Sequence, residues 1–430
     1  MSVNTSSSRH TSMKTVAVGS FMGSMLEWYD FYLYGTAAAL VFAKLFFPDF
    51  SALGGTLAAF ATFGAGFFTR PLGGLIFGHY GDKLGRKSIL VLTLLIMGVS
   101  TLLIGLLPTY DSVGYWAPTM LVALRLLQGL GLGGEYGGAA LMVIEHAPKS
   151  KRGFWGSLPQ IGSPAGLLLA TGIFTLCSLL PEDQFMSWGW RLPFVLSALL
   201  LGVGLFIRLR VQETPEFEAV KSEGKESAMP LKDLVKHHPR STGLAVVSRL
   251  ADAAASNIFN AFALAYISQQ LKLPDTIALT GVIIASAVQL GLLPLFGKLS
   301  DRWGRRQLYA TGAAFTCLYA FPFFWLLNTG STPLIWLAIT IGFSLCTGLM
   351  FSVQPTFFAE IFRPEVRYTG LSVAYQISAL LAGVTPFIAT SLLEFGDGSP
   401  WGVSVYLFVI AALSFLSILR LATTKDDTLA

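Results

Sequence analysis

The chain has 430 residues, of which 53% are hydrophobic and 12% charged, and its formal net charge is +5. This charged fraction is about half that of a soluble domain, and the mean hydropathy of +0.63 indicates a membrane protein with many spans. The net positive charge does not indicate nucleic-acid binding, because the basic residues are grouped in alternate loops. The sequence has no nucleotide-binding Gly-Lys-Ser/Thr loop, nucleophile elbow or cluster of metal ligands. These absences argue against an enzyme, a metal site, a cofactor and ATP-driven transport.

Apolar segments long enough to cross a hydrocarbon layer of ~30 Å recur along the whole chain. They run well beyond the ~10 residues of a barrel strand, so we predict that they are helices. The predicted fold is an all-α membrane protein with twelve transmembrane helices, centred near residues 32, 65, 98, 128, 167, 200, 255, 288, 318, 343, 380 and 411.

Basic residues lie mainly in the loops that follow the even-numbered segments. Lys83, Arg86 and Lys87 follow the second segment, and Lys149 and Lys151 follow the fourth. The positive-inside rule therefore places both termini in the cytoplasm. We expect a multi-pass membrane protein.

The first segment contains "SMLEWYDFYLYG", which places two acids, Glu27 and Asp30, at bilayer depth. A carboxylate there is unfavourable by several kcal/mol unless it is paired, neutralised or facing water. Asp30 lies three residues after Glu27 and four before Tyr34, so the three can share one helical face.

The second and fourth segments supply Arg70, Arg125 and Glu135. A guanidinium stays charged and can hold a substrate carboxylate in a two-point fork. The alternative for both arginines is a permanent ion pair with an acid that holds helices together. Gln128 shares a face with Arg125. Tyr136, like Tyr34, either lines the cavity or packs.

Proton coupling requires a group whose pKa can move into the physiological range. All five histidines fall in or beside predicted cytoplasmic segments, which leaves carboxylates. An acid that gains and loses an arginine partner can take up and release a proton. We predict Asp30 or Glu135 as the coupling site, with Glu27 as a further candidate.

The seventh segment carries Arg249 and Asp252, at positions i and i+3, which either face the substrate or satisfy each other. Asn257 and Asn260 follow. Buried amides need partners, which the hydroxyls of a substrate or a neighbouring helix can supply.

The two halves of the chain repeat each other. Asp301 in "GKLSDRWGRR" lies 219 positions after Asp82 in "GHYGDKLGRK", and Glu360 lies 215 positions after Glu145. Two motifs that repeat at nearly the same separation along the chain indicate two pseudo-symmetric six-helix bundles. The predicted parts are a tail over 1–14, a bundle over 15–211, a solvated connector with room for one surface helix over 212–239, a second bundle over 240–421 and a tail over 422–430.

The pattern Gly-x-x-x-Asp-x-x-Gly-Arg-Lys/Arg, present in both halves, resembles the signature of the major facilitator superfamily. Within it, "EWYDFYLYG", "RLLQGLGLGGEYGGA" and "WGWRLPF" resemble the metabolite:proton symporter family. "AFALAYISQQLKLP" and "YATGAAFTCLYAFPFF" are most similar to its shikimate permease branch. The Gly-Pro-x-x-Gly-Gly element typical of drug exporters is missing from "PQIGSPAGLLLATG".

The resemblance implies that charged loops at the helix ends hold the cytoplasmic gate closed. Anchoring of the topology is the alternative role for such basic loops. The residues assigned to the gate are Asp82, Gly85, Arg86, Lys87, Glu145, Arg152, Asp301, Arg305, Arg306, Glu360 and Arg367.

The sequence therefore predicts a secondary transporter that imports a small carboxylate with protons by alternating access. A shikimate-like hydroxylated acid is the first substrate candidate, and a di- or tricarboxylate is another. A proton-coupled betaine symporter, a passive uniporter and a transporter-like receptor stay open. The expected partners are a metabolite, protons and the lipid bilayer, without nucleic acid, and we expect a monomer.

Overall fold

The computed structural model describes residues 12–49, 52–223 and 229–421, and within these ranges all regular elements are helices. The N-terminal half comprises α1 (Met13–Ala37), α2 (Ala43–Phe46), α3 (Ala52–Leu84), α4 (Arg86–Leu106), α5 (Tyr110–Val113), α6 (Trp116–His146), α7 (Arg152–Ser157), α8 (Gly162–Cys177), α9 (Glu182–Ser187) and α10 (Leu192–Arg210). The C-terminal half comprises α13 (Pro239–Asn257), α14 (Ala263–Ala265), α15 (Asp275–Trp303), α16 (Arg305–Asn328), α17 (Thr332–Thr340), α18 (Gly348–Ile361), α19 (Arg367–Gly383), α20 (Thr385–Phe395) and α21 (Trp401–Arg420).

Short π-helical or 3₁₀ turns join several of these helices into longer spans, such as α7–α8, α13–α14 and α17–α18. Counted this way, twelve spans result, and each predicted centre falls inside one of them, which confirms the predicted architecture. In the described part of the chain, nine spans are long and apolar enough to cross a membrane by composition alone. The other three, formed by α1, α3 and α6, carry most of the buried charges of the N-terminal half; Arg86 of α4 and Arg208 of α10 are also buried.

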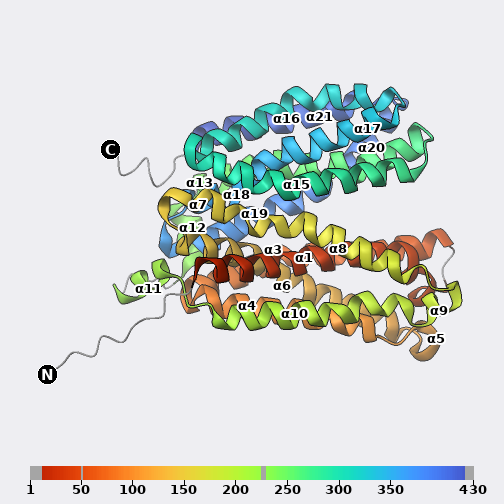
Figure 1. The fold of residues 1–430 in the computed structure, drawn as a ribbon, viewed down its shortest axis with the longest axis horizontal. Coiled ribbons are helices and arrows are strands. Elements are labelled where there is room, and N and C mark those ends of the chain that lie inside the picture. Colours follow the sequence, from red (N-terminus) through yellow and green to blue (C-terminus); the bar gives the residue numbers. More distant parts are fainter. Residues whose placement is uncertain (1–11, 50–51, 224–228, 422–430) are drawn as a thin grey trace.

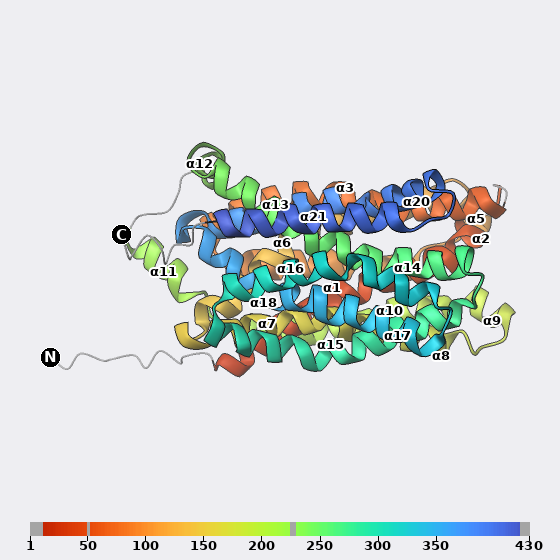
Figure 2. The ribbon, with the colours of Figure 1, turned by 90° about the horizontal axis from the view of Figure 1, so that it is seen from above.

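The two halves lie side by side with their long helices roughly parallel (Figure 1). We call the end that carries α11 (Pro215–Ser222) and α12 (Pro230–His237) the α11 end, and the opposite end the α9 end. Figure 2 confirms that α5 and α9 lie at the opposite end from α11 and α12. The connector predicted over residues 212–239 thus holds two short helices rather than one.

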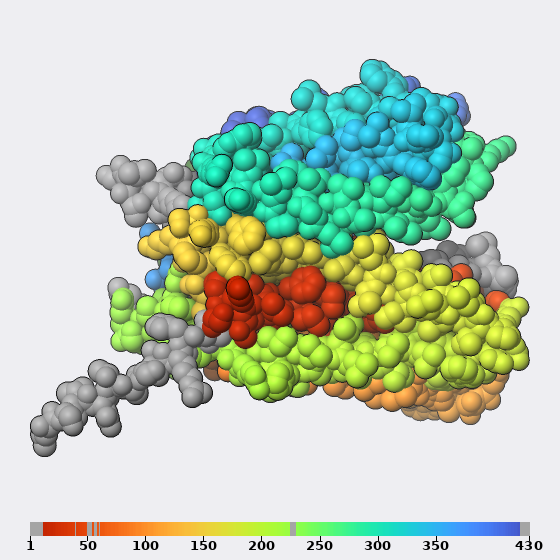
Figure 3. Space-filling model, in the orientation of Figure 1, coloured from red at the N-terminus to blue at the C-terminus, as the bar shows by residue number. Residues whose placement is uncertain are grey.

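Among the described residues, the cluster of buried side chains to which both halves contribute lies at the α11 end. There, Phe77 and Tyr136 of the N-terminal half belong to one apolar cluster with Tyr309 and Tyr368 of the C-terminal half. Toward the α9 end each half has a buried cluster of its own. Figure 3 shows the same difference, with the halves in contact on the left and a notch between them on the right. The protein is therefore closed at the α11 end.

The turns between α3 and α4 and between α15 and α16 are built alike. Gly85 has φ +108° and Gly304 has φ +98°, which lie in the region that favours glycine. A Cβ at residue 85 would also collide with the carboxylate of Glu213. The chain therefore makes a tight turn at Gly85.

The substitution Gly85→Ala is expected to destabilise the protein by about 1–3 kcal/mol, because alanine strains a backbone conformation of this kind. The measurement is the thermal unfolding midpoint in detergent. Gly172→Ala is the matched control, since a Cβ there meets open space within 4 Å, and it should leave the midpoint unchanged or raise it. Equal midpoints for both variants would contradict the prediction.

Candidate functional site

A chain of hydrogen bonds inside the N-terminal half joins Arg125 to Asp30. Arg125 Nη1 donates to Gln128 Oε1 at 2.6 Å, and Gln128 Nε2 donates to Thr101 Oγ1 at 2.7 Å. Thr101 Oγ1 in turn donates to Asp30 Oδ2 at 2.6 Å. Asp30 Oδ1 and Arg125 Nε are buried without a hydrogen-bond partner among the described residues. Arg125 and Asp30 are thus connected through two neutral side chains, and each has one polar atom that can still form a hydrogen bond.

Two aromatic rings pack against the guanidinium group of Arg125. Its guanidinium carbon lies 4.2 Å from the ring centroid of Tyr34 and 4.9 Å from that of Phe63. The Tyr34 hydroxyl is 2.7 Å from Thr62 Oγ1, which fixes the ring. Such cation–π contacts stabilise a desolvated guanidinium without neutralising it. Tyr34 is therefore placed to orient Arg125 rather than to stand free in a cavity.

Glu27 and Arg70 form the second charged pair of the N-terminal half. Arg70 Nη2 lies 3.5 Å from Glu27 Oε1, and both side chains are at most 10% exposed. Arg70 Nε also donates to Gln376 Oε1 of the C-terminal half at 3.2 Å. Arg70 thus adopts the ion pair that the sequence left open as an alternative, at a position where the two halves meet.

Gln354 on α18 organises the polar residues of the C-terminal half. Its Oε1 accepts from Tyr136 Oη at 3.0 Å and from Arg249 Nε at 3.3 Å. Its Nε2 donates to Asp252 Oδ2 at 3.2 Å and to Tyr309 Oη at 3.1 Å. Arg249 and Asp252 are therefore linked through a glutamine, and Tyr136 brings the N-terminal half into the same network.

Arg249 is oriented by Tyr375 much as Arg125 is by Tyr34. Its guanidinium carbon lies 3.6 Å from the Tyr375 ring centroid, and its Nη1 donates to Ser378 Oγ at 2.9 Å. The Tyr375 ring stacks on that of Tyr136, with centroids 3.6 Å apart. Arg125 and Arg249, one in each half, are therefore both buried arginines oriented by a tyrosine ring.

The predicted polar residues of α13 lie further toward the α9 end. Asn257 Nδ2 donates to the carbonyl of Ala253 at 2.8 Å and to that of Ala382 at 3.3 Å. Its amide group is thus used between helices, which was one of the two predicted roles. Asn260 is half-buried in the π-helical turn Ile258–Phe262.

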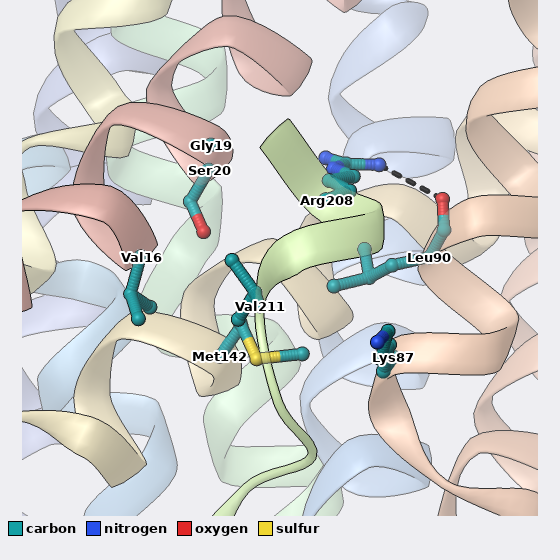
Figure 4. A pocket seen from close by; sticks show the side chains of 8 residues that line it. All are labelled: Val16, Gly19, Ser20, Lys87, Leu90, Met142, Arg208 and Val211. Atoms are coloured by element: carbon teal, nitrogen blue, oxygen red, sulfur yellow. Dashed lines mark hydrogen bonds between the residues drawn. The ribbon is translucent and has the colours of Figure 1, made fainter. Parts of the chain in front are cut away.

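Glu135 is paired with an arginine that the sequence analysis did not single out. Its carboxylate forms a buried ion pair with Arg208 of α10 and accepts from Thr93 Oγ1 at 3.0 Å. Arg208 Nη1 also donates to the carbonyl of Leu90 at 2.8 Å, as Figure 4 shows. These contacts all lie within the N-terminal half, so the structure does not join Glu135 to Arg125 or Asp30.

Glu135→Gln is expected to lower stability by about 3–5 kcal/mol, because removing one partner leaves the buried Arg208 charge uncompensated. The measurement is the thermal midpoint, and the double variant Glu135→Gln/Arg208→Met should recover most of the loss. A Glu135→Gln variant that melts like the wild type but no longer accumulates substrate in response to a pH gradient would instead identify Glu135 as a coupling group.

The halves are tied together at the α11 end by two equivalent contacts. Asp82 of α3 accepts from the backbone N–H groups of Tyr368 and Thr369, at 3.2 and 2.9 Å, in the first turn of α19. Asp301 of α15 accepts from the backbone N–H groups of Gly153 and Phe154, at 2.8 and 2.9 Å, in the first turn of α7. Each acid thus caps a helix N-terminus of the opposite half, where carboxylates are favoured.

Glu145 extends the first of these contacts. Its Oε1 lies 3.4 Å from Arg86 Nη2 and 3.3 Å from Arg367 Nη1, so it joins arginines of both halves. In the second contact, Arg305 lies 2.7 Å from Asp301 and 3.6 Å from Glu360.

Lys87 and Arg306, also assigned to the gate, make different contacts. Lys87 Nζ donates to the carbonyl of Leu209 at 3.0 Å, and Arg306 Nε donates to that of Ile418 at 3.1 Å. Each side chain therefore caps the C-terminal end of the last helix in its own half. These contacts stabilise each half separately and do not link the two halves.

The connector helix α11 contributes a third contact that the sequence analysis missed. Glu216 lies 2.5 Å from Arg152 of the N-terminal half and also pairs with Arg367 of the C-terminal half. Burial disfavours its charged form, yet the two guanidinium groups outweigh burial and hold the pKa of Glu216 below its usual range. Since a lowered pKa keeps the carboxylate ionised, this contact persists at neutral pH and weakens only as acid protonates Glu216.

Two further residues fix α11 in place. Glu213 accepts from the backbone N–H groups of Arg86 and Lys87, both at 3.1 Å, and the Arg86 guanidinium lies 5.0 Å from the Phe217 ring centroid. The signal for this helix was present in "TPEFE", because Thr214 is an N-cap residue followed by a proline at the first helical position. α11 is therefore a surface helix in the predicted connector: most of its residues are exposed, while Phe217 and the ion pairs of Glu216 fix it against both halves.

Comparison with known proteins gives consistent results. Residues 16–258 match the family described as "Sugar (and other) transporter", and residues 242–428 match "Major Facilitator Superfamily". The chain is 42% identical to the "Shikimate transporter" of Escherichia coli over 96% of the chain and 95% of that protein. It is 35% identical to the "Proline/betaine transporter" of Salmonella typhimurium over 97% of the chain and 85% of that protein.

Solved structures show the same fold. A double tryptophan mutant of XylE aligns with a TM-score of 0.75 at 18% identity, covering 95% of this chain and 94% of that one. The XylE proton:xylose symporter bound to 6-bromo-6-deoxy-D-glucose aligns with a TM-score of 0.73 at 17% identity, with the same coverage. All of these named relatives are transporters rather than enzymes.

Proposed function

Because the chain belongs to the sugar (and other) transporter family of the major facilitator superfamily, we propose that it imports a small hydroxylated carboxylate together with protons. Membership makes it a multi-pass membrane transporter of small molecules. The preferred substrate is a shikimate-like acid, since the relative that transports shikimate is 42% identical over nearly the full length of both chains.

The observation that carries the proposal is the state of Arg125. It is 1% exposed, it is braced by two rings, and the acid nearest in its hydrogen-bond chain, Asp30, is separated from it by Gln128 and Thr101. A buried guanidinium without a direct carboxylate partner attracts an anion strongly. A substrate carboxylate would supply the missing charge.

The hydrogen bonds from Arg125 through Gln128 and Thr101 to Asp30 also offer a way to couple substrate binding to proton binding. When Asp30 is ionised, its charge balances that of Arg125 through Thr101 and Gln128. When Asp30 is protonated, the positive charge of Arg125 is no longer balanced, and binding of an anion becomes more favourable. Proton and substrate anion would therefore bind together with no change in the net charge of the site, as symport requires.

Release of the substrate requires the α11 end to open. The contacts made by Asp82, Asp301, Glu145 and Glu216 all cross between parts of the protein that would have to separate. They support a gate at this end, in a rocking movement of the two halves. The concentration of basic residues in the loops of this end supports a cytoplasmic location in the bacterial inner membrane. We propose a monomer as the working unit.

The function is tested by uptake of labelled shikimate into proteoliposomes under an imposed pH gradient, with unlabelled hydroxylated monocarboxylates, dicarboxylates, tricarboxylates and betaine as competitors. Competition by hydroxylated acids alone supports the proposal. Competition by betaine would favour an osmolyte symporter, which the 35% identical relatives keep open. Accumulation that persists with a protonophore would remove proton coupling.

Arg125→Lys is expected to raise the apparent KM about tenfold, because lysine keeps the charge but loses the fork and the ring contact, worth about 1.4 kcal/mol. The measurement is initial uptake against substrate concentration. Arg210→Lys is the matched control, since Arg210 is exposed at the end of α10. An unchanged KM in Arg125→Lys would remove Arg125 from the binding site.

A further inference from the structure

A groove at the α11 end lies outside the transport pathway described above. It has a volume of about 770 Å³ and runs between α3 and the connector helix α12. The α3 wall is apolar and exposed, with Leu72 at 51% and Tyr80 at 45% exposure. The α12 wall carries Val235, which is 67% exposed, and two lysines, Lys232 and Lys236.

The arrangement of α12 explains why its lysines face the groove. Leu234 is buried at 1% exposure and anchors the helix in the core cluster of the α11 end. Lys232 and Lys236 are four residues apart, so they lie on one face, one turn from each other. Asp233 does not line the groove. Its Oδ1 lies 3.9 Å from His237 Nδ1. His79 is the other basic residue of the lining.

We propose that this groove binds one anionic phospholipid. Two lysine ammonium groups at its polar side fit a lipid phosphate, and the apolar α3 wall fits an acyl chain that runs down α3 from Tyr80 to Leu72. A free phosphate ion would leave the apolar wall uncovered, whereas a zwitterionic lipid would not use the full positive charge. Charge complementarity together with the apolar wall therefore selects an anionic lipid.

The position of the groove gives the lipid a consequence for the transporter. α3 belongs to the N-terminal half, and α12 packs against α3 as well as against α13 and α19 of the C-terminal half. Figure 2 shows α12 at the edge of the bundle beside α13. A lipid that fills the groove touches both walls and stabilises the conformation in which the α11 end is closed.

Retention of dioleoylphosphatidylglycerol by the purified full-length protein, measured by native mass spectrometry, tests the proposal. Lys232→Gln/Lys236→Gln should lower retention roughly tenfold or more, because each lysine near an anionic lipid contributes appreciable binding. Lys221→Gln/Lys298→Gln removes the same charge from exposed positions at this end that do not line the groove, and it should retain the lipid as the wild type does.

Four outcomes would overturn the proposal. The lysine variant could keep its phosphatidylglycerol, both variants could lose it equally, or dioleoylphosphatidylcholine could be retained as well as phosphatidylglycerol. A dimer mass that disappears only in Lys232→Gln/Lys236→Gln would also overturn it, since the groove would then hold a second copy of the chain. The measurement does not depend on the substrate or on proton coupling.

Discussion

Asp30→Asn is expected to abolish pH-driven accumulation of the substrate while substrate exchange across the membrane continues. Asparagine has nearly the shape of aspartate, and its amide oxygen can still accept the bond from Thr101. It cannot take up or release a proton. The carrier can therefore still bind and reorient, but the pH gradient no longer drives the direction of transport.

The measurement compares two assays on the same proteoliposomes. Net uptake under an imposed pH gradient should fall to the level reached without a gradient, while counterflow of labelled against unlabelled substrate should stay close to that of the wild type. Asp275→Asn is the control, because Asp275 is an exposed acid at the start of α15. Full accumulation by Asp30→Asn would remove this residue from coupling, and loss of both activities would indicate a role in binding instead.

Much of this site could be predicted because the residues that compose it are conspicuous in a membrane sequence. Glu27, Asp30, Arg70 and Arg125 stand out as charges in apolar helices. The repeated loops identified Asp82 and Asp301 as equivalent residues. Their partners could not be predicted, because those partners are backbone N–H groups at the starts of α19 and α7, which carry no sequence signal of their own.

Other features of the site depend on which helices become neighbours. The spacing between Gln128 and Glu135 along α6 does not reveal whether Glu135 faces the transport pathway or Arg208 on α10. The packing of α6 against α10 decides this, and it pairs Glu135 with Arg208. Gln354 is a neutral amide in an apolar segment, so nothing in its sequence marks it as the link between Arg249 and Asp252. Glu216 was missed because a short helix of mixed charge looks like a solvated surface.

Asp82→Asn combined with Asp301→Asn is expected to open the α11 end. A hydrogen bond to a charged group contributes about 1.5–3 kcal/mol to stability. Asp301 accepts two such bonds from the opposite half and Asp82 accepts three. Asparagine retains an oxygen acceptor but loses the charge. Even a loss of about 1.4 kcal/mol per contact shifts the ratio of closed to open protein about a hundredfold.

Spin labels at residues 151 and 302 can report this change, because both positions are exposed and lie on opposite halves at the α11 end. The distance distribution between the labels, measured in a background without the three native cysteines, should gain a longer component in the double variant. Asp183→Asn, an exposed acid on α9, is the control. An unchanged distribution in Asp82→Asn/Asp301→Asn would show that these two contacts do not hold the gate.

The use of backbone N–H groups as partners has a consequence for the response to salt. Ion pairs between exposed side chains weaken as ionic strength rises, since mobile ions screen charges beyond about 10 Å at 0.1 M. Asp82 is only 3% exposed, and it accepts from two peptide N–H groups and from Thr369 Oγ1, all less than 3.5 Å away. Dissolved ions cannot enter so short and buried a contact. The Asp82 contact should therefore persist nearly unchanged from dilute buffer to molar salt, whereas the pair of Arg152 with Glu216, whose side chains are 17% and 25% exposed, should weaken.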